Sequence, residues 1–284
     1  MLCIALMAVM VAFLAVTSRV TVRTFERLER EAPLALFGKG PMEAVYSALE
    51  PFARGLAMLG VSANSITMAS LVLAAVAALH FALGHFGVGA LIACMSALAD
   101  AVDGLVARQT RTANRFGRVL DTTVDRYVEA LLLGGIAIRV HHDAWVLAVV
   151  LAAMVGGFMV SYASSMLREL DVPDPGSRMR RAERLTFLIA GATLVPLLAE
   201  AAPDVAPALQ LSPLLAALAA IAVVGNVSAA RRLLGAARSA PRPTSYEKTW
   251  PTSSQFLIQR ESRSVGGTDE RRRSPRARCD ADTV

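Results

Sequence analysis

The amino-acid sequence predicts an all-α integral membrane protein, with about six transmembrane helices preceded by an interfacial amphipathic helix. Of the 284 residues, 55% are hydrophobic and only 18% are charged. The mean hydropathy of +0.49 is too high for an ordinary soluble domain of this length. The chain also contains apolar runs of roughly the 20 residues that a helix needs to cross a bilayer. These runs are 65–83, 87–106, 119–140, 144–166, 185–202 and 205–229.

The segment before the first run has the pattern of a helix that lies in the membrane interface. Within residues 40–60, Val45, Leu49 and Leu56 recur at helical spacing, while Glu50 lies on another face. A helix with one apolar and one charged face binds at the membrane surface and does not cross it. We therefore expect an interfacial helix at 40–60, followed by a six-helix domain at 61–235.

The two ends of the chain differ from this domain in composition. Residues 1–39 comprise an apolar run at 1–16 and a basic linker. We interpret the run as an uncleaved anchor, because no charge precedes its apolar core as it would in a cleavable signal. Residues 236–284 are rich in Pro, Ser, Thr and Arg, a composition that predicts a disordered basic tail.

Lysine and arginine are distributed unequally among the connections between the runs. They are frequent before the first run, between the second and third, between the fourth and fifth, and after the sixth, and nearly absent from the alternate connections. The positive-inside rule then places both flanks of the domain in the cytoplasm, in a multi-pass protein of the cell (inner) membrane. The net charge of +6 indicates this topology and contact with anionic lipid; no nucleic-acid partner is expected.

Four aspartates gather where the second run ends and the third begins. Asp100 and Asp103 are three residues apart and share a helix face, and Asp121 and Asp125, four apart, share a face of the next helix. Carboxylates at a membrane boundary are costly and repel one another, so we expect a cation among them. All-oxygen ligands suit Mg²⁺ or Mn²⁺, and two such ions could clamp a pyrophosphate, which favours phosphoryl transfer.

These acids have two other possible interpretations. The aspartates could simply pair with the arginines of the connection between the two runs, such as Arg108 and Arg111, but such pairs explain one or two acids and not two matched helical pairs. A cation or proton pathway in a noncatalytic transport protein would place acids nearer mid-membrane and on more helices.

In a phosphoryl-transfer site, Gly104 and Gly117 would leave room for a ligand or a neighbouring helix, and Arg108 would meet a phosphate.

At these residues the chain resembles the CDP-alcohol phosphatidyltransferase family, whose signature is D-x2-D-G-x2-A-R-x8-G-x3-D-x3-D. Every fixed position is filled with its spacing intact, by Asp100, Asp103, Gly104, Ala107, Arg108, Gly117, Asp121 and Asp125. The resemblance extends over about residues 40–232. It implies metal-dependent transfer of a phosphatidyl group from CDP-diacylglycerol to an alcohol, with release of CMP, in phospholipid biosynthesis.

The resemblance also implies roles for individual residues. Two divalent ions, Mg²⁺ or Mn²⁺, would be held by Asp100, Asp103, Asp121 and Asp125, and Asp125 would also be the base that accepts the acceptor's hydroxyl proton. The donor would be bound by Asn64, Thr67, Gly104, Ala107, Arg108, Thr112 and Gly117. Residues 62–67 resemble the family's Pro-Asn-x-Leu-Thr entry to the first span, with Ala63 in place of Pro.

A further resemblance concerns the acceptor. Ser161-Tyr162, followed by Arg181-Ala-Glu-Arg184, is similar to members that accept a phosphorylated alcohol such as glycerol 3-phosphate or inositol phosphate. Those members usually carry basic residues soon after the Ser-Tyr, where this chain has Ser164, Ser165 and Met166. We expect a phosphorylated acceptor bound by Arg168, Arg181 and Arg184; the alternative for the last two is an anchoring role in topology.

The small residues Gly134, Gly135, Gly156 and Gly157 lie within the third and fourth runs. Small residues let membrane helices pack closely, and they mark either a homodimer seam or packing within one chain. The three cysteines are far apart, with no CxxC or histidine spacing, so neither a disulfide framework nor a zinc site is expected.

Overall fold

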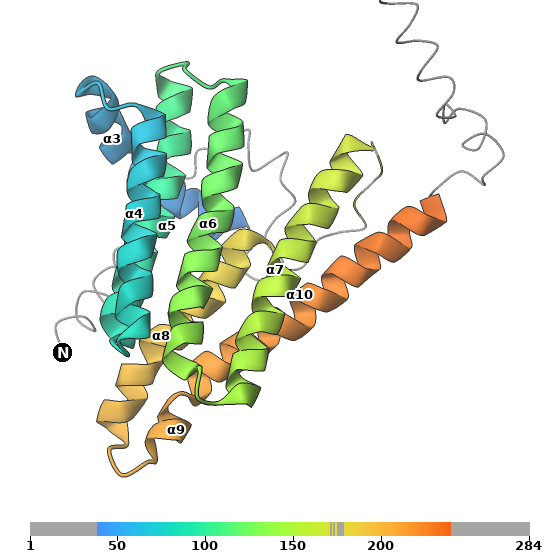
Figure 1. Cartoon of the computed structure of the whole chain (residues 1–284). Coiled ribbons are helices and arrows are strands. Elements are labelled where there is room, and N and C mark those ends of the chain that lie inside the picture. Colours follow the sequence, from blue (N-terminus) through green and yellow to red (C-terminus); the bar gives the residue numbers. More distant parts are fainter. Residues whose placement is uncertain (1–38, 171, 173, 175–178, 240–284) are drawn as a thin grey trace, which may run out of the picture. The chain divides into compact units, whose positions relative to one another are not determined.

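The computed structural model describes residues 39–170, 172, 174 and 179–239, and all regular structure in these ranges is helical (Figure 1). The expected all-α fold class is confirmed. The anchor and linker expected at 1–39 lie outside the described residues, apart from Lys39, and so does the tail expected at 236–284, apart from its first four residues.

The helices follow the expected order along the chain. They are α3 (Lys39–Met58), α4 (Ala63–Ala82), α5 (Phe86–Gln109), α6 (Arg115–Val140), α7 (Ala144–Glu169), α8 (Arg181–Ala201), the one-turn α9 (Pro207–Gln210) and α10 (Ser212–Ser239). By length and composition, α4, α5, α7, α8 and α10 can each cross a membrane. The 26-residue α6, expected as the third span, does not meet the same measure of apolarity, because it carries Asp121, Asp125, Arg126 and Glu129.

The start of the last helix differs from the expectation. The run 205–229 predicts one continuous helix, whereas the structure has the short α9 and then α10 from Ser212, which continues ten residues beyond the predicted end. Proline explains the break, because it lacks an N–H and is accepted in the first turn of a helix but not in its interior. Pro207 opens α9, and Pro213 lies in the first turn of α10.

A tight turn and one side-chain cap join α5 to α6 and bring the four aspartates to the same end of these two helices. The turn between α5 and α6 includes Arg111 in the left-handed backbone conformation (φ 55°). Asn114 then caps α6, its Oδ1 accepting a hydrogen bond from the Gly117 N–H at 2.7 Å. Because α5 ends and α6 begins within a few residues, the last turns of one helix lie beside the first turns of the other.

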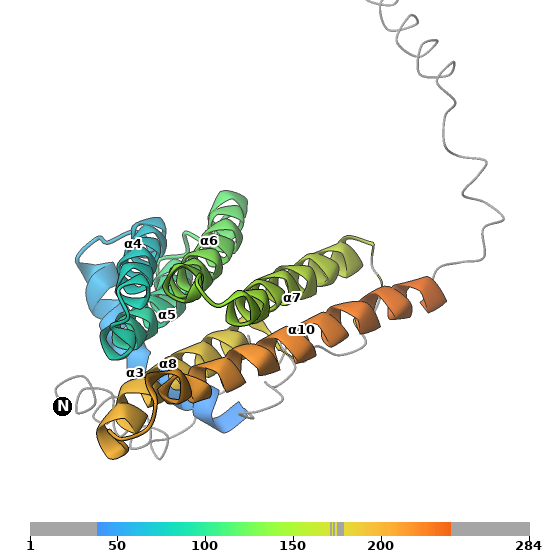
Figure 2. The same ribbon diagram turned by 60° about the horizontal axis from the view of Figure 1, so that its bottom comes forward.

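The helices α4, α5 and α6 lie side by side and share a core of small and branched apolar residues (Figures 1 and 2). Ala74, Ala77 and Phe81 of α4 meet Leu132 and Ile136 of α6, all of them fully buried. At Gly135 the backbones come so close that an added Cβ would overlap the carbonyl group of Ala78. Glycine is therefore required where α6 crosses α4.

The helices α7, α8 and α10 pack together through similar close approaches (Figure 2). A Cβ on Gly156 of α7 would meet the Asn226 side chain of α10 at 2.7 Å, and one on Gly191 of α8 would meet the Ala217 side chain of α10 at 2.8 Å. The Asn226 side-chain amide donates a hydrogen bond to the Ala152 carbonyl of α7 at 2.9 Å. Packing within one chain thus accounts for Gly135 and Gly156, whereas Gly134 has no atom within 4 Å of its added Cβ; a homodimer seam stays a prediction.

We predict that Gly135→Ala lowers the thermal stability of the detergent-solubilised protein, because overpacking a tight contact costs about 1–3 kcal/mol. The neighbouring Gly134→Ala is the matched control, since its new methyl group would enter open space. Thermal unfolding of both variants checks this. Equal melting temperatures for the two variants would show that the α4–α6 crossing does not need a glycine.

Candidate functional site

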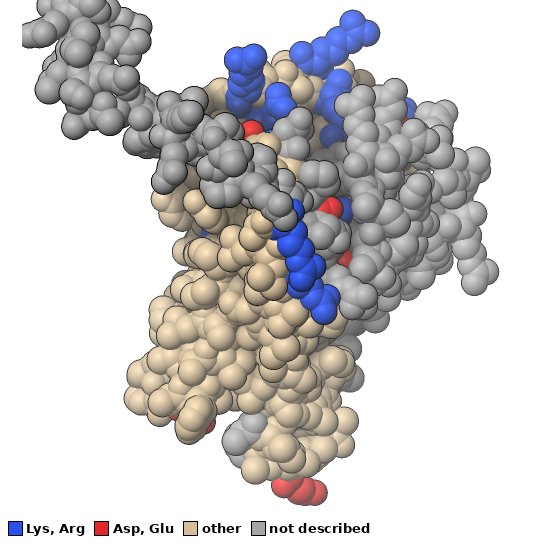
Figure 3. Space-filling view, turned by 90° about the vertical axis from the view of Figure 1, so that its right-hand side faces the viewer, with Lys and Arg blue, Asp and Glu red and all other residues tan. Residues whose placement is uncertain are grey.

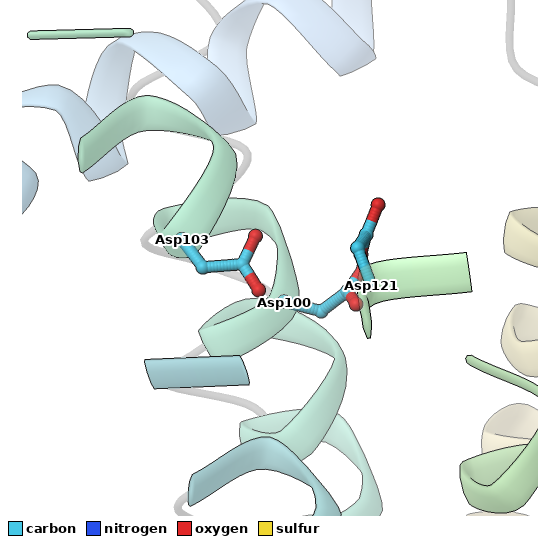
Figure 4. A group of neighbouring side chains, drawn as sticks. All are labelled: Asp100, Asp103 and Asp121. Atoms are coloured by element: carbon cyan, nitrogen blue, oxygen red, sulfur yellow. The ribbon is translucent and has the colours of Figure 1, made fainter. Parts of the chain in front are cut away.

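Three of the four aspartates converge between α5 and α6. Asp100, Asp103 and Asp121 each offer a carboxylate oxygen, and these three oxygens lie within 4.8 Å of one another. Figure 4 shows the three side chains directed toward a common space, two from α5 and one from α6. Asp103 is buried, and the other two are half-buried. The arrangement agrees with the helical spacing of the sequence.

Thr67 of α4 holds Asp103 in place. Its hydroxyl donates a hydrogen bond to Asp103 Oδ2 at 2.5 Å, and both residues are buried. Ser62 is the N-cap of α4 and accepts a hydrogen bond from the Ser65 N–H. This cap fixes the position of Thr67 in the second turn of the helix. A residue expected at the donor site is thus also a direct partner of an expected metal ligand.

The fourth aspartate, Asp125, faces an arginine from the start of α8. Arg181 Nη1 lies 2.6 Å from Asp125 Oδ1 and donates a hydrogen bond to Asp100 Oδ2 at 2.7 Å. The three side chains are between 17% and 20% exposed, so solvent screens these ion pairs only in part. Asp100 therefore belongs both to the group with Asp103 and Asp121 and to the group with Asp125 and Arg181.

The oxygens of this cluster fit a divalent cation. Asp100 Oδ1 is buried and accepts no hydrogen bond from a described residue, whereas Asp125 Oδ1 is compensated by its ion pair with Arg181. Leaving a buried carboxylate oxygen without a donor is costly, and a metal ion satisfies it as well as a donor does. Carboxylate oxygens alone make a ligand set that suits Mg²⁺ or Mn²⁺. Asp100, Asp103 and Asp121 would hold such an ion.

A cavity of about 590 Å³ opens beside the triad, within the usual range of about 300–1,000 Å³ for small-molecule sites. It lies between the α3–α4 connection and the α5–α6 turn, and Asp103 and Asp121 form part of its wall. All seven residues expected to bind the donor line it: Asn64, Thr67, Gly104, Ala107, Arg108, Thr112 and Gly117. The cavity therefore brings together residues from three helices, α4, α5 and α6, and from the turn between α5 and α6.

The three arginines expected at the acceptor occupy different positions. Arg181 contacts the acids directly, as described above. Arg184 is buried behind them, where its Nε and Nη2 donate to the two carboxylate oxygens of Glu129 at 2.5 and 2.7 Å. Arg168 is exposed near the end of α7, and its Nε donates to the Ser164 carbonyl of the same helix at 3.2 Å.

Two residues near the site were missed by the sequence interpretation. Glu129 lies four residues after Asp125, so it continues the helix face of Asp121 and Asp125, and this spacing could have identified it. Arg126 donates to Ser161 Oγ on α7 at 2.6 Å and lies 3.6 Å from Glu129 Oε2. No sequence pattern links Arg126 to Ser161, because the contact joins residues 35 positions apart.

Clustered carboxylates beside a cavity, at one end of a bundle of apolar helices, are typical of a site that binds a charged ligand at a membrane boundary. The family model for CDP-alcohol phosphatidyltransferase matches residues 60–227, and the chain belongs to this family. The match covers the whole site described above. Together with the apolar helices, family membership makes the chain a multi-pass membrane protein.

Curated relatives show similarity over part of their length. The chain is 34% identical over 121 residues to archaetidylinositol phosphate synthase of Pyrococcus horikoshii, covering 42% of this chain and 62% of that protein. It is 30% identical over 178 residues to phosphatidylinositol phosphate synthase of Corynebacterium glutamicum, covering 61% of this chain and 80% of that protein. The chain thus spans less than two thirds of the length of the first relative and more than two thirds of the length of the second.

Solved structures share the fold. The crystal structure of Mycobacterium tuberculosis phosphatidylinositol phosphate synthase with CDP-DAG bound matches with a TM-score of 0.57 and 25% identity, over 66% of this chain and 92% of that chain. A structure of the same protein in complex with manganese and citrate matches with a TM-score of 0.58.

We predict that Asp103→Asn weakens Mn²⁺ binding about tenfold or more, because the variant keeps the shape of the side chain and removes a charged oxygen ligand. Titration of the solubilised protein with Mn²⁺, followed by electron paramagnetic resonance, measures the affinity. Asp204→Asn, at an exposed position in the α8–α9 connection, is the control and should bind as wild type does. Unchanged affinity in Asp103→Asn would remove this residue from the metal site.

Proposed function

We propose that the protein transfers the phosphatidyl group of CDP-diacylglycerol to an alcohol that carries a phosphate, with release of CMP. The main support is that the Asp103 and Asp121 carboxylates form part of the wall of a cavity lined by every residue expected to bind the donor. The names of the relatives, archaetidylinositol phosphate and phosphatidylinositol phosphate synthases, favour inositol phosphate as the acceptor, with glycerol 3-phosphate as the alternative.

The distribution of charge supports a cytoplasmic active site in the cell membrane. Figure 3 shows Lys and Arg side chains gathered toward one end of this face, with acidic atoms visible among them, above a mainly uncharged body. Basic residues concentrate on the cytoplasmic side of membrane proteins. Helix α3, which packs on α5 at this end, would then lie in the cytoplasmic interface.

The donor would place its cytidine and pyrophosphate in the cavity, against Arg108 and the glycines of the signature. We propose two ions, Mg²⁺ or Mn²⁺, at the aspartates; when bound, they would neutralise pyrophosphate oxygens and stabilise the charge of the leaving CMP. Thr67 contributes by fixing the orientation of Asp103 through their hydrogen bond. Asp121 also forms part of the cavity wall, while Asp100 contacts Arg181 on the side of Asp125.

The acceptor would react on the side of Asp125 and Arg181. The acceptor hydroxyl oxygen bonds to the phosphorus that carries diacylglycerol, the bond from this phosphorus to the oxygen of CMP breaks, and Asp125 receives the hydroxyl proton. Arg181 Nε is buried and has no hydrogen-bond partner among the described residues. This free donor, beside Asp125, supports Arg181 as a ligand of the acceptor phosphate.

The proposed function is tested by measuring CMP release from CDP-diacylglycerol in membranes that contain the protein. We expect release that requires Mg²⁺ or Mn²⁺ and is fastest with inositol phosphate or glycerol 3-phosphate, compared with free inositol and serine. Absence of CMP with every acceptor would favour a noncatalytic or transport role. Preference for an unphosphorylated alcohol would contradict the proposed acceptor class.

We predict that Asp125→Asn lowers turnover at least about a hundredfold, since general bases contribute roughly 10²–10⁴-fold to rate. Binding of CDP-diacylglycerol should largely persist, because Asp125 lies outside the Asp100–Asp103–Asp121 group. Rates of CMP release and equilibrium binding of the donor measure the two effects. Glu50→Gln on α3 is the control variant, and a near-normal rate in Asp125→Asn would exclude a role as base.

We predict that Arg181→Ala raises the KM for the phosphorylated acceptor about tenfold or more, since a hydrogen bond to a charged group contributes about 1.5–3 kcal/mol. The KM for CDP-diacylglycerol should change little. Arg139→Ala, near the opposite end of α6 and exposed, is the matched control. An unchanged acceptor KM in Arg181→Ala would show that this arginine does not bind the acceptor phosphate and only forms ion pairs with the acids.

A further inference from the structure

We propose that Ser96 is a positioning residue for the metal and donor sites. Its hydrogen bond to the backbone of α4 fixes the register between α4 and α5 and thereby keeps the Thr67 hydroxyl on Asp103. Ser96 is not among the residues that line the cavity, so it acts only through the helices. The part of the proposal that concerns the donor rests on the proposed function, whereas the part that concerns the placement of Asp103 does not.

The buried polar residues of α4 and α5 form one chain of hydrogen bonds. Both helices are described in full, and their buried polar residues are Thr67, Ser70, Ser96 and Asp103. Ser96 Oγ donates to the Ser70 carbonyl at 2.7 Å, and Ser70 Oγ donates to the Thr67 carbonyl at 2.7 Å. The Thr67 hydroxyl then donates to Asp103 Oδ2. Since Ser70 and Ser96 are 0% and 1% exposed, no solvent competes for these bonds.

Two of these three bonds cross between the helices, in opposite directions. Thr67 of α4 donates to a side chain of α5, and Ser96 of α5 donates to the backbone of α4. A carbonyl oxygen has two lone pairs, so the Ser70 carbonyl can accept the Ser96 hydroxyl and still belong to its own helix. The contact points are three residues apart on α4 and seven apart on α5. Together the two bonds therefore restrict both the sliding and the rotation of one helix against the other.

Thr67 does not hold this register alone, because its hydroxyl has a second acceptor. The hydroxyl carries one hydrogen, and its oxygen lies 3.1 Å from the Ala63 carbonyl of the same helix, compared with 2.5 Å from Asp103 Oδ2. If α4 turned away from α5, Thr67 would stay satisfied within α4 and only Asp103 would lose its donor. A second contact is needed to keep Thr67 on the carboxylate, and Ser96 supplies it.

The apolar part of the contact defines the register of the two helices only weakly. Much of it consists of the buried alanines Ala74, Ala77, Ala90 and Ala93. Small residues let helices approach closely, but a surface of methyl groups offers little resistance to sliding. A buried hydrogen bond has a defined geometry and can fix the register of two packed helices, as a buried polar residue does in coiled coils.

The register matters because the site is built across this contact. Asn64 and Thr67 of α4 line the cavity together with Gly104 and Ala107 of α5. A shift by one residue along a helix is about 1.5 Å, whereas the groups of a functional site must be placed to within about 0.5 Å. A hydroxyl outside the cavity can therefore determine how the Asp103 carboxylate is presented to a metal ion.

The two buried serines provide a matched test. Ser96→Ala removes a bond between helices, whereas Ser70→Ala removes a bond within α4 and leaves the Ser70 carbonyl in place. We expect Ser96→Ala to weaken Mn²⁺ binding at least about threefold, the effect of losing one average hydrogen bond between membrane helices. Ser70→Ala should bind Mn²⁺ as the wild type does. Titration of the solubilised protein with Mn²⁺, followed by electron paramagnetic resonance, measures both affinities, and equal affinities in the two variants would overturn the proposal.

Coupling to Thr67 distinguishes positioning from an independent effect. Thr67→Val keeps the shape of the side chain, removes the hydroxyl and should weaken Mn²⁺ binding about tenfold, as loss of a residue that orients a metal ligand does. If Ser96 acts through Thr67, the double variant Ser96→Ala/Thr67→Val binds Mn²⁺ as Thr67→Val does. A loss equal to the product of the two separate losses would show that Ser96 acts independently and that the proposal is wrong. Where Ser96→Ala gives no folded protein, Ser96→Cys, with a similar shape and a weaker donor, takes its place in both comparisons and the same outcomes decide.

Kinetics at saturating Mn²⁺ extend the test to the donor. Ser96→Ala should raise the KM for CDP-diacylglycerol with little change in the KM for the acceptor, because α4 and α5 both line the cavity. The control is Thr193→Val, which removes a hydroxyl that bonds to a carbonyl of its own helix, α8, and should react as the wild type does. An acceptor KM that rises as much as the donor KM would indicate general loosening of the bundle and contradict the proposal. If no acceptor yields CMP in the wild type, the proposed function fails, while the Mn²⁺ titrations still test Ser96.

Discussion

The need to compensate charge inside an apolar helix bundle governs the arrangement of this protein. Asp100, Asp103, Asp125 and Glu129 are wholly or largely removed from water, in surroundings where an unpaired carboxylate is costly. The cost is offset by cations and donors that come from other helices, including Arg181 and Thr67. The acids therefore determine how α4, α5, α6 and α8 meet.

Close packing of the apolar surfaces of the helices brings these polar groups within contact distance of one another. Thr67 can donate to Asp103 because α4 lies directly on α5 and α6, and the α4–α6 approach depends on alanines and on Gly135. On the other side of the acids, Gly157 lets α7 cover the Glu129–Arg184 pair. Small residues far from the chemistry thus set the distances between charged groups within it.

The acids border two different environments. On one side lies a cavity of about 590 Å³ lined by the signature residues and by Asn64 and Thr67. On the other side are Asp125, Arg181 and the α6–α7 contact between Arg126 and Ser161. In the proposed reaction the donor would occupy the first environment and the acceptor the second, so that the acids lie between the attacking and leaving groups. Ser164 and Ser165 on α7 hydrogen-bond to carbonyls of their own helix and add no charge to the second environment.

Local patterns in the chain were sufficient to predict most of the fold and the convergence of three aspartates. Hydropathy identified the helices, and spacings of three and four residues placed Asp100 with Asp103 and Asp121 with Asp125, because a helix face follows from sequence alone. The break before α10 and the contacts of the arginines were not predictable in this way. Arg181 lies 81 residues from Asp100, and Arg184 lies 55 residues from Glu129. Which arginine meets the acids and which is buried behind them depends on how α8 packs against α5, α6 and α7, and no periodicity within one helix contains that information.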